Sequence, residues 1–218
     1  LNNVEELILE EGPDTIGAFI AEPVMGAGGV IIPPKNYFSK VQALLKKYDV
    51  LFIADEVICG FGRTGNMWGS ETFDLKPDIL TCAKALSSAY APISALLINE
   101  TIISEIEKQA NELGIFGHGF TYSAHPMAAA VALRTLEIYE EKKIVEHVRE
   151  TEKSFTQRVK DFKKYDFVGD TRAIGLIGAI EFVSEPGSNK KPDPSRKVAA
   201  KIQQKIQEAG VILRSLPG

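Results

Sequence analysis

Cysteine is scarce in this sequence of 218 residues, which contains only Cys59 and Cys82. Two thiols are too few for a disulfide scaffold or a zinc cluster, so we expect both to be buried and reduced. No apolar run reaches the roughly 18 residues that a membrane-spanning helix needs, and the start lacks the basic and then apolar pattern of a signal peptide. These absences exclude disulfide-rich secreted proteins and membrane proteins, and they favour a protein of the cytoplasm.

Positive charge is also in short supply, because 25 lysines and arginines stand against 29 aspartates and glutamates, a formal net charge of −4. This balance excludes a protein that binds nucleic acid through bulk positive charge. Hydrophobic residues make up 44% of the sequence, which is typical of a folded globular protein and too much for a disordered one. The length is enough for one sizeable hydrophobic core and a smaller second unit.

Short apolar runs alternate with helical patterns over the first two-thirds of the sequence. Apolar residues recur at helical spacing and predict helices over 37–48, over 101–113 and after Pro126. The runs that predict strands occupy residues 16–21, 50–54, 79–83 and 93–98. They are apolar throughout, which suits a sheet covered by helices on both faces. Strands that alternate with helices predict an α/β fold with a mostly parallel sheet.

The last third of the sequence has a different character. Two strand patterns between residues 167 and 183 are followed by a polar loop and by a helix that starts at Val198. An apolar run at 211–213 predicts the beginning of another strand. We therefore expect a large domain over residues 1–150 and part of a small α+β domain over residues 151–218.

A glycine pattern follows the second predicted strand. Residues 60–65 read Gly-Phe-Gly-Arg-Thr-Gly and match the G-x-G-x-x-G pattern of dinucleotide-binding folds. In those folds a helix opens directly at the glycines and covers the pyrophosphate. Here residues 66–69 read Asn-Met-Trp-Gly, which is a poor helix start. An NAD-binding oxidoreductase is therefore a weak alternative from a different functional class.

Asp55 ends one predicted strand and Lys84 ends the next. In open α/β sheets, ligands bind at the carboxyl ends of the strands, so both side chains can face one ligand. Pyridoxal phosphate needs such a pair: a lysine amine forms a Schiff base with its aldehyde, and a carboxylate keeps its pyridine nitrogen protonated. The ordinary interpretation also stays open, in which the lysine is solvated and the aspartate forms a turn or a helix cap.

Four segments together resemble the hallmark sequences of the class III, or omega-type, pyridoxal-phosphate aminotransferases, which have fold type I. They read Ala-Glu-Pro-Val-Met-Gly-Ala-Gly-Gly at 21–29, Ile-Ala-Asp-Glu-Val-Ile-Cys-Gly-Phe-Gly-Arg-Thr-Gly at 53–65, Pro-Asp-Ile-Leu-Thr-Cys-Ala-Lys at 77–84 and His-Gly-Phe-Thr-Tyr-Ser-Ala-His-Pro at 118–126. They occur in the family's order and extend over nearly the whole sequence. The resemblance implies that the large domain binds the cofactor and that both expected domains are partial.

The resemblance also implies a role for five residues. Lys84 holds the cofactor as a Schiff base and then moves the proton between substrate and cofactor. Asp55 pairs with the pyridinium nitrogen, and Val57 packs on the face of the ring. Thr121 binds the cofactor phosphate across the subunit interface of a homodimer, although an ordinary turn hydroxyl is the other interpretation. Glu22 lies near the hydroxyl side of the cofactor.

The activity that the resemblance implies is transfer of an amino group from an amine or omega-amino acid to a 2-oxo acid such as pyruvate, in a ping-pong reaction. An aminomutase or a decarboxylase of the same fold would use the same residues. Ala27 stands where some relatives carry a glutamate, which argues against ornithine and γ-aminobutyrate as donors. Family members are much longer, so we expect a fragment with little or no activity alone, and a non-catalytic fragment is the last alternative.

The remaining polar residues of interest predict no second site. No spacing among the three histidines and two cysteines resembles a metal site. His118 and His125 belong to the loop of Thr121, and His147 is expected on a solvated helix face. Arg63 is expected to be a structural ion-pair partner rather than a ligand of the substrate carboxylate.

Overall fold

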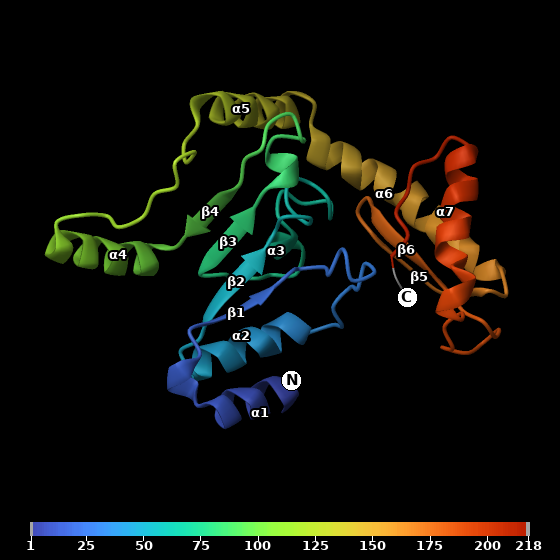
Figure 1. Ribbon diagram of the computed structural model, residues 1–218, viewed down its shortest axis with the longest axis horizontal. Coiled ribbons are helices and arrows are strands. Elements are labelled where there is room, and N and C mark those ends of the chain that lie inside the picture. Colours follow the sequence, from blue (N-terminus) through green and yellow to red (C-terminus); the bar gives the residue numbers. More distant parts are fainter. Residues whose placement is uncertain (1, 217–218) are drawn as a thin grey trace.

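The computed structural model describes residues 2–216, and its centre is a four-stranded sheet (Figure 1). The strands lie in the order β1 (Ala18–Ala21), β2 (Leu51–Asp55), β3 (Ile79–Cys82) and β4 (Ala95–Ile98). The pairs β1–β2 and β2–β3 are parallel, and β4 runs antiparallel to β3. The prediction of an α/β fold with a mostly parallel sheet is therefore confirmed.

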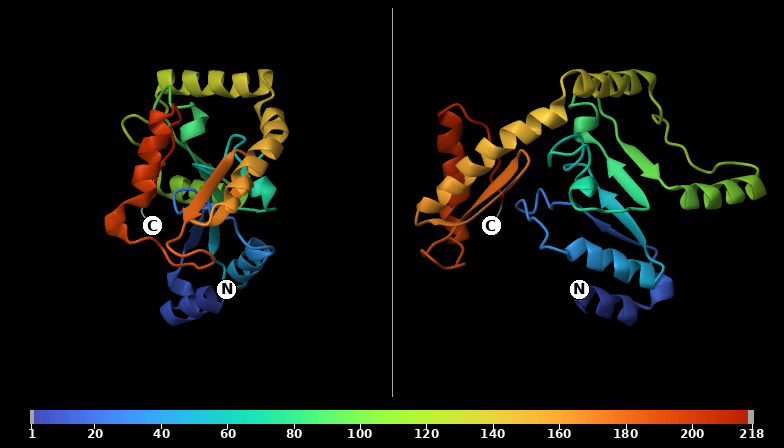
Figure 2. Two further views of the ribbon diagram at one scale, coloured as in Figure 1. Left: turned by 90° about the vertical axis from the view of Figure 1, so that its right-hand side faces the viewer. Right: turned by 180° about the vertical axis from the view of Figure 1, so that it is seen from behind.

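The helices also follow the predicted pattern. They are α1 (Asn2–Glu11), α2 (Tyr37–Lys47), α3 (Gly69–Thr72), α4 (Glu100–Leu113), α5 (Pro126–Glu141), α6 (Ile144–Asp161) and α7 (Val198–Glu208). The long helical stretch after Pro126 is two helices, because Lys143 takes a left-handed φ of 50° that no α-helix accommodates. α4 and the loop that follows it project from the rest of the chain (Figure 2).

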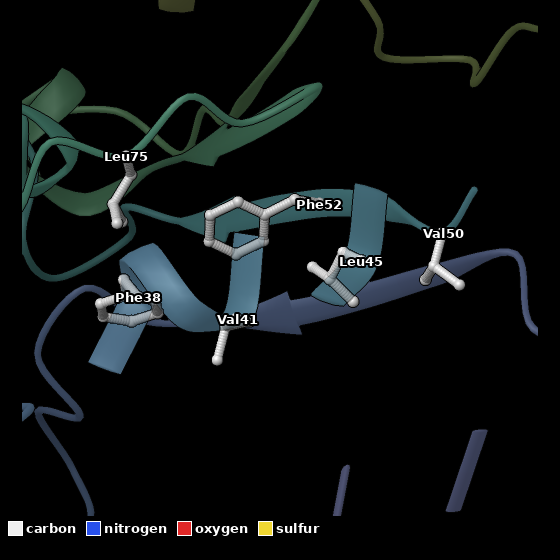
Figure 3. Close-up of a cluster of buried hydrophobic side chains, with 6 residues drawn as sticks. All are labelled: Phe38, Val41, Leu45, Val50, Phe52 and Leu75. Carbon is white, nitrogen blue, oxygen red and sulfur yellow. The ribbon is translucent and has the colours of Figure 1, made fainter. Parts of the chain in front are cut away.

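The main hydrophobic core lies between α2 and the sheet (Figure 3). Phe38, Val41 and Leu45 recur at helical spacing on one face of α2, and they pack against Phe52 of β2. Val50 and Leu75 complete this buried cluster. Burial of each large apolar side chain stabilises the fold by roughly 1.5–3 kcal/mol, so this face fixes α2 on the sheet.

The opposite face of the sheet is less well covered. Phe19 and Ala21 of β1 pack against the main core, so Ile20 points to the other side of the sheet, where it is 58% exposed. Leu96 and Leu97 of β4, which point to opposite faces because they are consecutive, are exposed as well. Large apolar side chains are therefore open to a partner surface along two strands of the sheet.

A second sheet stands apart from the first and consists of the antiparallel hairpin β5 (Val168–Ile174) and β6 (Ile177–Phe182). α6 leads from the main body to this hairpin (Figure 1). Residue 150 lies inside α6, so the predicted domain division at that position stays a prediction. The prediction of a strand at 211–213 is wrong, because Val211 and Ile212 are exposed and pair with no strand within residues 2–216.

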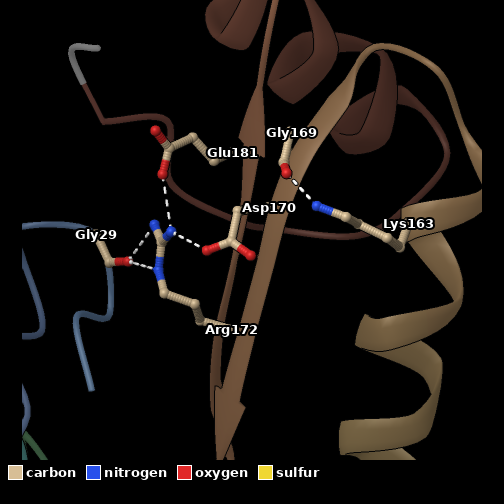
Figure 4. A network of polar contacts seen from close by, with 6 residues as sticks. All are labelled: Gly29, Lys163, Gly169, Asp170, Arg172 and Glu181. Carbon is tan, nitrogen blue, oxygen red and sulfur yellow. Dashed lines mark hydrogen bonds and ion pairs between the residues drawn. The ribbon is translucent and has the colours of Figure 1, made fainter. Parts of the chain in front are cut away.

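Arg172 of β5 joins the hairpin to the main body (Figure 4). Its Nε and Nη2 donate to the carbonyl oxygen of Gly29, in the loop between β1 and α2, at 3.0 and 2.9 Å. Its Nη1 contacts the carboxylates of Asp170 and Glu181 at 2.6 and 2.8 Å. Lys163 also donates to the carbonyl of Gly169 in the same region. A cation held by two carboxylates thus fixes the loop that follows β1.

Both cysteines are buried and form no disulfide bond, as the sequence predicts. The Cys59 thiol donates to the carbonyl of Val24, and the Val24 N–H donates back to the sulfur, both at 3.4 Å. Burial raises the pKa of the Cys59 thiol to about 12. Because the thiolate is the reactive form, this shift suppresses the chemistry of the thiol.

We predict that Cys59 and Cys82 resist maleimide in the folded protein. A rise in pKa from 9.0 to about 12 lowers the thiolate fraction of Cys59 by roughly three orders of magnitude at neutral pH. Mass spectrometry after timed labelling measures the rates in buffer and in urea. Ser154→Cys, on the exposed side of α6, is the control that reacts in both conditions. Rapid native labelling of Cys59 would contradict the burial that the structure shows.

Candidate active site

The two residues predicted to serve the cofactor lie at one edge of the sheet. Asp55 ends β2 and is paired in register with Thr81 of β3. The next N–H, that of Glu56, donates to the carbonyl of Thr81 at 2.9 Å. Lys84 follows three residues after Thr81 and opens the single-turn helix η2 (Lys84–Leu86). The structure therefore brings Asp55 and Lys84 to neighbouring strand ends, as the sequence predicts.

The backbone around Lys84 is strained. Lys84, Ser88 and Ala89 all have left-handed φ angles, of 43°, 49° and 65°. Such conformations cost a non-glycine residue of order 1 kcal/mol each, and they persist only where the surroundings hold them. Buried Leu86 and the hydrogen bond from Ser87 Oγ to the carbonyl of Ala91, at 2.5 Å, supply part of that support. Strain of this kind concentrates at functional sites.

Asp55 and Val57 belong to one turn after β2. The Val57 N–H donates to Asp55 Oδ1 at 3.0 Å, so the carboxylate is held by the backbone two residues on. Both residues are half-buried. This hydrogen bond couples the direction of the Asp55 carboxylate, which is predicted to face the ring nitrogen, to the position of Val57, which is predicted to pack on the ring.

Glu22 closes a turn in the loop between β1 and α2. Its Oε2 accepts a hydrogen bond from the Gly26 N–H at 2.9 Å. A Cβ at Gly26 would lie 2.6 Å from Cδ1 of Ile58, so this loop lies close against the segment that follows Asp55, and a larger residue at position 26 would require the Ile58 side chain to move. The loop that Glu22 closes thus lies beside the turn after β2, and the expected place of Glu22 near the hydroxyl side of the cofactor stays a prediction.

A cavity of about 580 Å³ adjoins these strand ends, and its lining is mostly apolar. Lys84 and Val57 both line it, together with the glycine loop at 60–63 and residues of α5 and α6. Pockets of this size, apolar with few polar groups, are the usual form of a small-molecule site. Lys84 supplies an amine to this cavity, which fits a ligand with an aldehyde group and an aromatic ring.

Thr121 lies elsewhere. It belongs to the loop at 114–125, between α4 and α5, and it is exposed. The described residues that line the cavity do not include it, and neighbouring Phe120 and Tyr122 are 76% and 81% exposed. Within one chain the structure therefore does not bring Thr121 to Lys84, and its contact with a phosphate across a subunit interface stays a prediction.

Two further residues line the cavity. His147 of α6 is exposed, as expected, and it lies at the cavity together with Lys84, which the sequence did not predict. The break at Lys143, which separates α5 from α6, turns the first turns of α6 toward the cavity. Arg63 contacts the backbone of the hairpin: Nη1 donates to the carbonyl of Leu176 at 3.1 Å, and the Leu176 N–H donates to the Arg63 carbonyl at 3.0 Å. Because Arg63 also lines the cavity, its expected structural role stays a prediction.

The glycine loop is a docking surface for the β5–β6 hairpin. Gly175, in the turn of the hairpin, has a φ of 53°, and a Cβ there would collide with the backbone of Arg63. Arg149 of α6 also donates from Nε to the carbonyl of Gly65 at 2.6 Å. α3 begins only at Gly69 and has four residues, so no long helix opens at these glycines. The context of a dinucleotide site is therefore missing here.

Glu56 is the buried carboxylate of the site, and sequence reasoning did not single it out. It is fully buried, its Oε1 accepts from the N–H and Oγ of Ser70, both at 2.6 Å, and its Oε2 accepts from the Gly69 N–H at 2.9 Å. Burial raises the pKa of Glu56, while these hydrogen bonds oppose the rise. Glu56 stands between Asp55 and Val57, so it ties their turn to the start of α3.

Comparison with known proteins agrees with this geometry. The family model described as Aminotransferase class-III matches residues 1–217, so the chain belongs to the class III aminotransferase family. "Gamma aminobutyrate transaminase 3, chloroplastic" from Solanum lycopersicum is 52% identical over 213 residues, which are 98% of this chain and 41% of the relative. "Gamma-aminobutyrate transaminase 1, mitochondrial" from Oryza sativa subsp. japonica is 53% identical over 213 residues, with the same coverage of 98% and 41%.

Solved structures show the same fold. A structure described as "Transaminase with L-ala" has a TM-score of 0.96 at 50% identity and covers 99% of this chain and 51% of that chain. The omega transaminase from Pseudomonas jessenii in complex with PMP has a TM-score of 0.95 at 47% identity, with coverage of 98% and 47%. The chain thus spans about two fifths of the length of these curated relatives and about half of these solved chains. The family and fold expected from the four segments are confirmed.

No group of histidine, cysteine, aspartate or glutamate side chains within residues 2–216 is arranged to hold a metal ion. No helix among the same residues has the length and apolar character needed to cross a membrane.

We predict that the stability contribution of Glu56 falls as pH rises. Its pKa in the folded protein lies above the ordinary value of 4.5, so between these two values the folded state binds more protons than the unfolded state. The free energy of unfolding therefore decreases as pH rises through this window. Glu56→Gln removes the titration and disturbs the hydrogen bonds, which destabilises the protein at acid pH by about 1–3 kcal/mol.

Urea unfolding at a series of pH values from about 4 to about 8 measures this difference, because the series begins near the ordinary pKa of a glutamate and extends well above it. The advantage of the wild-type protein over Glu56→Gln should shrink with rising pH. Glu10→Gln, on exposed α1, controls for the loss of one negative charge. An advantage that grows with pH would show that Glu56 has a lowered pKa, contrary to its burial.

Proposed function

We propose that this chain carries the catalytic centre of a transaminase that moves an amino group from an amine or omega-amino acid to a 2-oxo acid such as pyruvate. The observation that carries the proposal is the cavity in which Lys84 and Val57 lie together, at the strand end that Asp55 terminates. Membership of the class III aminotransferase family, which depends on pyridoxal phosphate, supports it. Residues 1–150 would form the cofactor-binding domain and residues 151–218 part of the small domain.

The cofactor, when bound, supplies an aldehyde carbon that takes up the amino group and a ring that accepts electrons. Lys84 would hold this aldehyde through Nζ, and its free amine would serve as the base that moves a proton between the substrate Cα and the cofactor. Asp55 keeps the ring nitrogen protonated, because a carboxylate beside it favours the cationic form. Val57 would pack on the face of the ring, and Glu22 would lie near the hydroxyl side of the cofactor.

A homodimer with the active site at the subunit interface is part of the proposal. The projecting loop at 114–125 carries four large apolar side chains that are mostly exposed: Ile115, Phe116, Phe120 and Tyr122. Soluble monomers rarely leave such a group uncovered, so a second copy of the chain is expected to bury it. In that assembly Thr121 would bind the cofactor phosphate of the partner subunit through its hydroxyl.

The choice of donor is open to direct test. The curated relatives named above are γ-aminobutyrate transaminases, and γ-aminobutyrate is itself an omega-amino acid, so it belongs in the test despite the argument from Ala27. One solved neighbour is described with L-alanine, the product that pyruvate would give. We propose a cytoplasmic location from the two reduced thiols, whereas the relatives are named for chloroplasts and mitochondria.

We predict that Lys84 is the residue modified by the cofactor. Protein incubated with pyridoxal phosphate should gain visible absorption, and borohydride reduction followed by peptide mapping should locate the adduct at Lys84. Lys84→Ala should lose the absorption and at least about a thousandfold of the turnover measured in the full-length protein. Lys40→Ala, on the exposed side of α2, is the matched control and should behave as wild type.

The same experiment separates the alternatives. Alanine formed from pyruvate in proportion to consumed donor indicates a transaminase, whereas carbon dioxide or an isomeric amine indicates a decarboxylase or an aminomutase. Binding of NAD with no adduct at Lys84 would overturn the proposed function. The isolated 218-residue chain is expected to give little or no turnover, as a partial chain would.

We predict that Asp55→Asn lowers kcat by about 100-fold or more, because a neutral amide no longer stabilises the protonated ring nitrogen. Steady-state kinetics of the full-length protein measure kcat and KM separately, and the visible spectrum reports whether the cofactor is still bound. Asp14→Asn, in the exposed turn after α1, is the control. An unchanged kcat with bound cofactor would remove Asp55 from the proposed role.

A further inference from the structure

We propose that Tyr139 is a positioning residue for Lys84, and that it acts by holding the strained backbone of η2 from the neighbouring helix α5. The inference rests on the proposed function, since it concerns the lysine assigned there. The Tyr139 hydroxyl donates to the carbonyl of Ala85, the residue directly after Lys84, at 2.6 Å. The same hydroxyl lies 2.7 Å from Ser88 Oγ.

The number of protons decides the direction of these two hydrogen bonds. A tyrosine hydroxyl has one proton, and the Ala85 carbonyl only accepts, so that proton is given to Ala85. Ser88 Oγ must therefore donate to the Tyr139 oxygen. The Tyr139 hydroxyl thus bridges Ala85 and Ser88, and it holds the two ends of this turn together from α5.

This turn needs support from outside because its own backbone is unfavourable. Lys84 and Ser88 both have left-handed φ angles, so relaxation of the segment would change the direction in which the Lys84 side chain leaves the backbone. The two hydrogen bonds of Tyr139 act on positions 85 and 88, within this segment. Loss of the hydroxyl would therefore change the direction of the Lys84 side chain as well as lower the stability of the protein.

The ring of Tyr139 is held independently of its hydroxyl. Ala132, Leu136 and Tyr139 recur at helical spacing on α5 and pack into the cluster that contains Phe61 and Leu86. The ring centroids of Tyr139 and Phe61 are 6.3 Å apart. Tyr139 also lines the cavity together with Lys84. Replacement by phenylalanine thus keeps the packing and removes only the bridge.

The test compares Tyr139→Phe with Tyr48→Phe in the full-length protein. The Tyr48 hydroxyl also makes a hydrogen bond, to Glu5 Oε1 at 2.8 Å, but Tyr48 directly follows α2 and packs against the main core, and it does not line the cavity. Both variants lose one tyrosine hydroxyl, so both should unfold at a slightly lower temperature. Only Tyr139→Phe should alter the behaviour of Lys84.

Two readouts report on Lys84 directly. Competitive labelling of the cofactor-free protein with acetic anhydride gives the reactivity of Lys84 relative to the other lysines, and we expect about a threefold or larger change in Tyr139→Phe. The visible absorption of the protein loaded with pyridoxal phosphate, followed against pH, should shift in the same variant. In steady-state kinetics kcat should fall about fivefold while KM changes little, because one neutral hydrogen bond is lost.

Unchanged Lys84 labelling and an unchanged spectrum in Tyr139→Phe would overturn the inference, whatever the loss of stability. This failure is distinct from failure of the proposed function, in which wild-type protein itself forms no borohydride-stable adduct at Lys84. If Tyr139→Phe does not fold, Ser88→Ala takes its place, because it removes the second contact of the same bridge. A smaller change of the same kind is then expected, and wild-type labelling in Ser88→Ala would also overturn the inference.

Discussion

Parallel pairing of β2 with β3 is the constraint from which the site follows, because it sets the ends of both strands at one edge of the sheet. The register is fixed at the opposite edge by Asp78. Its carboxylate accepts from the Phe52 N–H at 2.8 Å and from the Asn99 side chain at 2.9 Å, so one residue ties the starts of β2 and β3 to the end of β4. A slip of one residue would turn Asp55 to the other face of the sheet.

The edge of the sheet at which β2 and β3 end, near Asp55 and Lys84, is stabilised differently from the edge at which they begin, near Asp78. Polar contacts from other elements stabilise it: Glu56 ties the β2 turn to α3, Tyr139 holds the η2 backbone, and Arg172 fixes the loop after β1. These contacts come from segments far apart in the sequence. Reactive groups at strand ends lie outside the regular hydrogen bonds of the sheet, so their directions depend on such support.

Much of this was predictable from the sequence, for reasons that are local. The apolar runs of β2 and β3 and the helical spacing of α2 each follow from burial of neighbouring residues, and the positions of Asp55 and Lys84 follow from the strand ends. The left-handed backbone of Lys84, the break at Lys143 and the place of His147 depend on tertiary packing, which a single sequence does not display. The strand expected at 211–213 failed because an apolar run needs a partner strand to form one.

The glycine loop shows why a pattern must be interpreted in its fold. A Cβ at Gly60 would lie 2.9 Å from the carbonyl oxygen of Glu56 and 3.0 Å from the Trp68 ring, so this glycine permits a tight turn after β2. Gly65 has a φ of 89° and offers its carbonyl to Arg149 of α6. The same spacing that elsewhere lets a backbone approach a pyrophosphate here lets one part of the chain approach another. Because close approach is the physical requirement in both cases, only the elements that follow the glycines separate the two functions.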